Sequence, residues 1–168
     1  MRCYHVPVLM LVSLLVGCVA SGGDFHAELN KPEGGRARLY VYRTHTIIGI
    51  AAADVPIIHL DGRRLTRIRI GGYLMVPISP GQHELTTTES LLGSDTGKVR
   101  GETTFTASAG ETIYLRYTEA FKSFTPILLP SGAIVESSGD YRFEPVPEAE
   151  ALAELAKTKP LEVETKIQ

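Results

Sequence analysis

Residues 55–85, VPIIHLDGRRLTRIRIGGYLMVPISPGQHEL, decide the fold. Asp61-Gly62 lies between two apolar runs and predicts a hairpin turn, because glycine tolerates the positive φ that such a turn requires. Pro80-Gly81 predicts a second turn, and Gly71-Gly72 interrupts the segment between the two turns. Apolar residues alternate with other residues over 74–79, which is the period of a half-buried strand. The stretch therefore predicts three short strands, and it contains no nucleophile beside a base.

The composition is that of one globular domain with appendages. The chain has 168 residues, of which 43% are hydrophobic, and a domain of about 150 residues buries enough surface to fold without disulfides. The net charge of −2 argues against nucleic-acid binding, because nucleic-acid modules usually carry a basic excess. The two cysteines, Cys3 and Cys18, both lie near the N-terminus. The rest of the chain therefore has no disulfide framework and no cysteine-based metal site.

The N-terminus has the pattern of an export signal. Arg2 precedes an apolar run at Val6–Gly17 that is too short for a bilayer core of about 30 Å and has the length of a signal-peptide apolar region. The run ends in Leu15-Val16-Gly17-Cys18, which resembles the bacterial lipobox, and the resemblance implies that Cys18 is acylated and becomes the first residue. Two alternatives are a cleaved soluble signal, with Cys18 incidental, and a buried apolar strand.

Acylation at Cys18 predicts that the membrane is a partner of this protein. Several acyl chains give stable anchoring, whereas one chain binds only marginally. By analogy with the sorting rule of bacterial lipoproteins, Val19 in place of aspartate predicts the outer membrane, with the protein facing the periplasm.

Shifts in composition divide the chain into four parts. We expect a lipoprotein signal peptide at 1–17, the lipidated cysteine and a flexible tether at 18–35, a β-sandwich domain at 36–146, and a C-terminal helix and tail at 147–168. The tether is rich in glycine, serine and charge and lacks apolar periodicity. Phe25 and His26 leave a second alternative, in which this segment docks on the domain or on a partner.

The first strand of the domain is predicted at Ala37–Arg43, with Leu39 and Val41 on an aliphatic face and two tyrosines on the other. Thr44–Asp54 is either a loop or a continuation of this strand. Turn signals about every ten residues favour a sandwich or small barrel, and we expect a small antiparallel β-sandwich. Further strands are predicted at Gln82–Glu89, Arg100–Ser108, Thr112–Thr118 and Tyr141–Glu144.

Two loops and one helix complete the prediction. Ser90–Gly97 is expected to be a loop, and Glu119–Gly132 a longer apolar loop that folds back over the core or, alternatively, exposes a partner surface. Pro147–Lys159 predicts a helix, with acidic residues near its start and lysines near its end. Its apolar stripe is expected to lie on the domain rather than to recruit another helix, and consists of Ala149, Leu152, Leu155 and Ala156.

Four motifs occur in order along the domain: Leu39–Arg43, Asp61-Gly62, Gly71-Gly72-Tyr73 and Pro80-Gly81-Gln82-His83. Together they resemble a family of small bacterial envelope lipoproteins of unknown function. The middle part is also similar to surface β-modules with a PEGA-like hairpin and a prealbumin-like sandwich. The resemblance covers about 36–117, and it implies a location and a fold class but no activity.

The histidines suggest two kinds of site, neither of which the sequence completes. His59 and Asp61 lie two apart on a predicted strand and would share a face, but a metal site needs three or four ligands. Ser79, His83 and Asp61 supply the residue types of a hydrolytic triad, yet no nucleophile elbow surrounds the serine. The alternative roles are turn chemistry for Asp61 and Ser79 and packing at a strand start for His83. We expect no catalytic residue, metal or cofactor.

The clearest binding feature is a group of four arginines within seven residues, Arg63, Arg64, Arg67 and Arg69. Guanidinium groups bind phosphate in a bidentate manner, so these residues are candidates for binding an anionic lipid or an acidic glycan. Arg67 and Arg69 share the solvent face if Ile68 and Ile70 point inward. The alternative is a solvated sheet face whose charges discourage edge pairing.

From these observations we expect a non-enzymatic binding or structural module of the bacterial envelope. Its partners would be the membrane and possible ligands of three kinds: another envelope protein, an anionic lipid or a glycan. The rival class is an envelope hydrolase or transferase acting on glycan or lipid. A soluble periplasmic solute binder is a third class, although the chain is short for a two-lobed protein.

Overall fold

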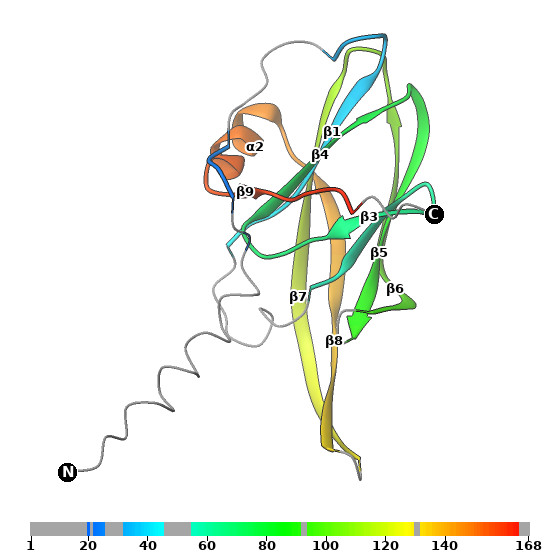
Figure 1. Ribbon diagram of the computed structural model, residues 1–168, viewed down its shortest axis with the longest axis vertical. Coiled ribbons are helices and arrows are strands. Elements are labelled where there is room, and N and C mark those ends of the chain that lie inside the picture. Colours follow the sequence, from blue (N-terminus) through cyan, green and yellow to red (C-terminus); the bar gives the residue numbers. More distant parts are fainter. Residues whose placement is uncertain are drawn as a thin grey trace, which may run out of the picture.

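The computed structural model describes residues 20, 22–25, 32–45, 55–91, 94–129 and 132–164 (Figure 1). Within them, two sheets pack face to face, with the orders β8-β7-β1-β4-β9 and β3-β2-β5-β6. The predicted all-β sandwich with a C-terminal helix is confirmed. One detail is wrong: the first sheet is mixed rather than antiparallel, because β1 pairs in parallel with β7 and β4 with β9. The strands are β1 (Ala37–Arg43), β2 (Ile57–Leu60), β3 (Arg63–Arg67), β4 (Gly72–Ile78), β5 (Gly81–Leu91), β6 (Ser94–Ala107), β7 (Thr112–Leu129), β8 (Gly132–Pro145) and β9 (Lys159–Pro160).

Strand β1 is the centre of the mixed sheet and is buried along its whole length. Its aliphatic face, with Leu39 and Val41, belongs to the core between the two sheets. Its aromatic face, with Tyr40 and Tyr42, belongs to a second cluster under the helix. The two faces predicted from the alternation are confirmed, and both are covered because the sheet has a second sheet on one side and a helix on the other.

The central stretch changes sheets twice. Asp61 and Gly62 have φ values of 51° and 75°, so the predicted tight turn joins β2 to β3 within one sheet. At Gly71, with φ 67°, the chain crosses from β3 to β4 in the other sheet, and at Pro80-Gly81 it returns to β5. The three predicted strands are confirmed as β2, β3 and β4, and the glycines mark the crossings because only a residue without Cβ adopts such φ values easily.

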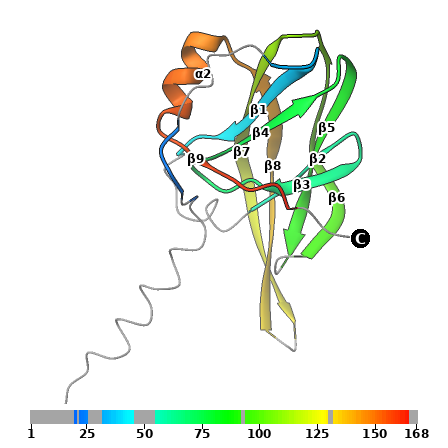
Figure 2. The same cartoon turned by 45° about the horizontal axis from the view of Figure 1, so that its top comes forward.

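The helix α2 runs over Glu148–Leu155 and lies on the mixed sheet (Figure 2), as predicted. It is shorter than the predicted Pro147–Lys159, because Thr158 donates a hydrogen bond to Leu155 O at 2.8 Å and the chain then joins the sheet as β9. Ala151 and Leu155 are its buried residues. The predicted stripe is therefore only partly right, since Ala149 and Ala156 are exposed.

The predicted long loop at Glu119–Gly132 is wrong. Residues 119–129 belong to β7, which pairs with β8 from Leu115↔Pro145 to Leu129↔Gly132. The two strands form a hairpin that projects from the sandwich (Figures 1 and 2). The pairing extends along the whole segment to Leu129↔Gly132, with one register shift between Phe121 and Ser123. The predicted loop at Ser90–Gly97 is likewise shorter, because β5 extends to Leu91 and β6 begins at Ser94.

The segment before the domain contacts it at several points. Ala20 N donates to Ile70 O at 3.0 Å, and the Phe25 ring packs edge-on against Tyr40 and Tyr73. The docking alternative therefore holds at Phe25, whereas Cys18 and His26 lie outside the described residues. In the described part of the chain, no helix is long and apolar enough to cross a membrane.

Candidate functional site

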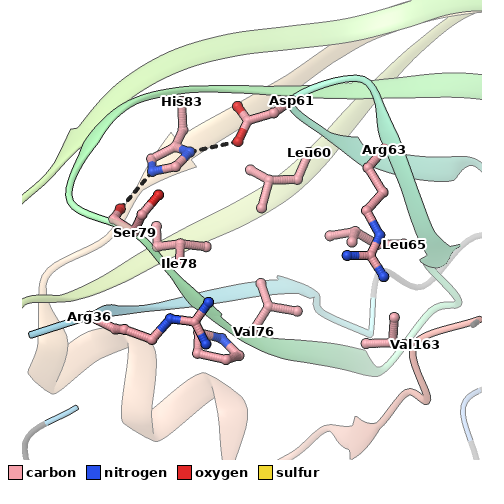
Figure 3. A pocket seen from close by; sticks show the side chains of 11 residues that line it. Arg36, Leu60, Asp61, Arg63, Leu65, Val76, Ile78, Ser79, His83 and Val163 are labelled. Carbon is pink, nitrogen blue, oxygen red and sulfur yellow. Dashed lines mark hydrogen bonds and ion pairs between the residues drawn. The ribbon is translucent and has the colours of Figure 1, made fainter. Parts of the chain in front are cut away.

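A pocket of about 450 Å³ lies between the two sheets, where the edge strand β3 faces β4 (Figure 3). The C-terminal segment forms one wall. Leu161 N donates to Tyr73 O and Glu164 N to Leu65 O, each at 2.7 Å, so this segment crosses from one sheet to the other. Apolar residues of both sheets and several polar residues line the pocket: Arg36, Leu60, Asp61, Arg63, Leu65, Val76, Pro77, Ile78, Ser79, His83 and Val163.

An Asp–His pair closes one end of the pocket. His83 Nδ1 lies 2.7 Å from Asp61 Oδ2, and His83 Nε2 lies 2.8 Å from the main-chain oxygen of Ser79 (Figure 3). The imidazole is 7% exposed. The second carboxylate oxygen of Asp61 accepts the main-chain N–H of Glu84 at 2.9 Å. The β2–β3 turn is thus tied to the start of β5 by one side-chain pair.

Both groups of the pair favour their charged forms. Desolvation opposes a charged imidazole, but the hydrogen bonds to the Asp61 carboxylate and the Ser79 carbonyl outweigh it and raise the pKa of His83. Desolvation likewise opposes the charged carboxylate, but the bonds from Glu84 and His83 lower the pKa of Asp61. Because both of its nitrogens face acceptors, His83 is best satisfied as an imidazolium that donates twice.

The triad residues do come together, but not in a catalytic arrangement. A serine nucleophile needs the histidine to accept its hydroxyl proton. Here Nε2 faces the carbonyl oxygen of Ser79 instead of its hydroxyl. The geometry is that of a polar clamp between a turn and a strand.

The structure does not bring His59 and Asp61 together as metal ligands. His59 Nε2 lies 3.0 Å from both Thr88 Oγ1 and Asp95 Oδ2, whereas Asp61 turns to His83. Across the described residues, no three histidine, cysteine, aspartate or glutamate side chains are placed to hold a metal ion.

The four arginines are distributed over different environments. Ile68 and Ile70 are buried, as predicted. Glu164 accepts a hydrogen bond from Arg64 Nη2 at 2.8 Å and lies 4.0 Å from Arg67 Nε. The C-terminal segment therefore partly neutralises the charge of the four arginines. Arg63 lines the pocket, whereas Arg64, Arg67 and Arg69 do not. Anion binding by the four arginines stays a prediction.

The sequence did not identify the apolar lining of the pocket as a site, and two lining residues, Arg36 and Val163, lie outside the stretch 55–85. Arg36 stands just before β1, and Val163 belongs to the tail after β9. No local pattern connects them to residues 60–83, because their proximity depends on how the sheets pair and on the path of the C-terminal segment.

Fold and pocket together define a two-sheet β-sandwich module with a ligand-sized pocket at the edge of its core. The family described as "Protein of unknown function (DUF2846)" matches residues 33–132, which is more than half of the chain, so the protein belongs to this family. The match includes every residue of the pocket except Val163. No curated protein and no solved structure matches the sequence.

Proposed function

We propose that this protein is a lipid-anchored, non-enzymatic binding module of the bacterial envelope, held at the outer membrane and facing the periplasm. The observation that carries the binding role is the combination of a pocket with a histidine whose two nitrogens are already engaged. Such a site offers shape, apolar surface and charge to a ligand, but it does not offer a poised base. The hydrolase alternative requires the imidazole of His83 to rotate away from both partners.

The anchoring part of the proposal rests on the apolar run and Cys18. Ala20 is hydrogen-bonded to Ile70, and two residues of chain span at most about 7 Å. An acyl group at Cys18 would therefore hold the domain close to the headgroups rather than on a long tether. The membrane would face the end of the sandwich where Gly72 pairs with Arg43. At this same end, β7 continues past β1 into the projecting hairpin.

Metabolic labelling with a palmitate analogue tests the anchor. We expect the wild-type protein to be labelled and to fractionate with the outer membrane, and Cys18→Ala to lose the label and remain unprocessed. Cys3→Ala is the matched control, because Cys3 lies within the segment that processing removes. Label retained in Cys18→Ala would refute the lipoprotein assignment.

A chromogenic short-chain ester tests the choice between binder and hydrolase. We expect hydrolysis by the purified protein at the rate of buffer alone. Turnover above buffer that is abolished by both Ser79→Ala and His83→Asn would establish the hydrolase instead.

A further inference from the structure

We propose that the pocket binds an amphiphilic anion, with an acyl or aryl body against the apolar walls and a carboxylate or phosphate held at the rim by Arg36 or Arg63. This inference rests on the proposed binding function and names its ligand class. Three observations carry it: the lining of the pocket, the charges at its rim and the closure of the neighbouring sheet edge.

The walls of the pocket are aliphatic on three sides. Leu60 and Leu65 come from the β2–β3 hairpin, Val76 and Ile78 from β4, and Val163 from the C-terminal segment. All five of these residues belong to the main core cluster or pack against it. A pocket of about 450 Å³ is within the usual range for small-molecule sites of roughly 300–1,000 Å³. The body of the ligand is therefore apolar.

The rim carries an uncompensated positive charge. Arg36 and Arg63 are exposed, and in Figure 3 they stand on opposite sides of the aliphatic side chains. Neither has an ion pair among the described residues. The carboxylate that lines the pocket, Asp61, is already paired with His83. A bound anion would therefore meet a guanidinium group on either side of the pocket without competing with a carboxylate for it.

A small amphiphile fits this pocket better than an extended peptide does. Strand addition would use the free main-chain groups of the edge strand β3, but Leu65 O already accepts Glu164 N at 2.7 Å. The tail that carries Val163 thus occupies the position that an added strand would need. The space that remains for a ligand is the pocket itself, and the protein's own C-terminal segment forms one of its walls.

Fluorescence titration of the acylated protein in phosphatidylcholine nanodiscs tests the inference. The probes are 1-anilinonaphthalene-8-sulfonate and its uncharged analogue N-phenyl-1-naphthylamine, with empty nanodiscs to correct for partitioning into lipid. We expect saturable binding of the sulfonate, weaker at high salt because exposed charges are screened. Displacement by decanoate and by decyl phosphate shows which head group is preferred, and 1-decanol should displace the sulfonate less well than either.

The decisive variant is Arg36→Gln/Arg63→Gln, compared with Arg69→Gln/Arg142→Gln, which removes the same charge away from the pocket. We expect the pocket variant to bind the sulfonate about tenfold more weakly and the uncharged analogue with unchanged affinity, while the control pair stays within about twofold of wild type. Three results would overturn the inference: no saturable binding, equal loss in both double variants, or an unchanged affinity of the pocket variant for the anion. These results would leave the anchor and the ester assays untouched, so failure of the ligand class is distinguishable from failure of the proposed function.

Discussion

The carboxylate of Asp61 lies 2.7 Å from Nδ1 of His83 and fixes the turn of one hairpin against the start of the next strand of the same sheet. Asp61 has φ 51°, a conformation that aspartate and asparagine tolerate better than most residues. Because His83 also faces the Ser79 carbonyl, the pair holds β5 close to the turn that brings the chain back from β4. One end of the pocket is therefore built by this contact.

The pair should contribute to stability in a limited pH window. The pKa of His83 is raised above 6.5, so its contribution is complete below about pH 6.5 and is lost as the pH rises through the folded value. The pKa of Asp61 is lowered below 3.8, so its contribution is lost only as the pH falls through that lower value. Asp61→Asn should therefore reduce the free energy of unfolding by about 1 kcal/mol near pH 5.5, and by less near pH 8.5, where His83 loses its charge. The effect at pH 5.5 is small because solvent partly screens the half-exposed carboxylate.

Urea unfolding of wild type and Asp61→Asn at the two pH values measures this difference. Asp140→Asn serves as the control, because its carboxylate pairs with Lys122 at 2.7 Å rather than with a histidine. An equal loss of stability at both pH values in Asp61→Asn would contradict the charged pair.

The attachment of α2 to the sheet should depend more on the hydroxyl of Tyr42 than on that of Tyr114. Tyr42 is fully buried, and its hydroxyl donates to Glu154 of α2 at 2.7 Å; the hydroxyl of Tyr114 is 3.4 Å from Glu148. We expect Tyr42→Phe to lower the free energy of unfolding by about 1–2 kcal/mol, since it removes a buried bond to a charged acceptor. Tyr114→Phe, with the longer contact, should cost less. Chemical denaturation measures both, and a larger loss for Tyr114→Phe would show that the hydroxyl bonds do not fix the helix.

The outer part of the β7–β8 hairpin should be dispensable for folding. Among the side chains that the structure describes, the outermost hairpin residues in contact with the core cluster are Tyr117, Tyr141 and Phe143. Ser123 pairs with Ser138, so residues 124–137 can be replaced by Asn-Gly, a pair that favours a two-residue hairpin turn. We expect the shortened protein to keep its free energy of unfolding within about 1 kcal/mol, as measured by urea denaturation. A loss of several kcal/mol would mean that the projecting part packs against the domain.

The end of the sandwich that bears Ala20 should face the membrane. In the acylated protein Cys18 is blocked, so Lys122→Cys near the base of the projecting hairpin and Ala109→Cys in the β6–β7 turn can each be labelled with a fluorophore; both residues are exposed. Because β7 runs from Thr112 towards the hairpin tip, the two positions lie at opposite ends of the mixed sheet. We expect quenchers in the lipid headgroups to reduce emission more strongly at 122 than at 109. The reverse order, or equal quenching, would refute this orientation.

Local patterns in the sequence predicted most of the strands because each depends on neighbouring residues. Alternation over 37–43 specified which side chains face the core, and the Asp-Gly pair specified the turn between β2 and β3. The same method failed at Glu119–Gly132, where Pro126 and the apolar run Ile127–Leu129 hide a strand. That strand exists because β8 pairs with it, and pairing between segments does not appear in the pattern of either one.

By itself, the sequence determined the fold class and the turns at Asp61-Gly62 and Pro80-Gly81, because these follow from periodicity and backbone φ preference. It also predicted an export signal from a contiguous apolar run. It also supplied the residues Asp61, His83 and Arg63. Only the tertiary structure decided that Asp61 pairs with His83, that Glu164 neutralises Arg64 one hundred residues earlier in the chain, and that Arg36 and Val163 join Arg63 at one pocket. The physical reason is that these contacts are made across sheets and along a crossing tail, where distance in space has no relation to distance along the chain.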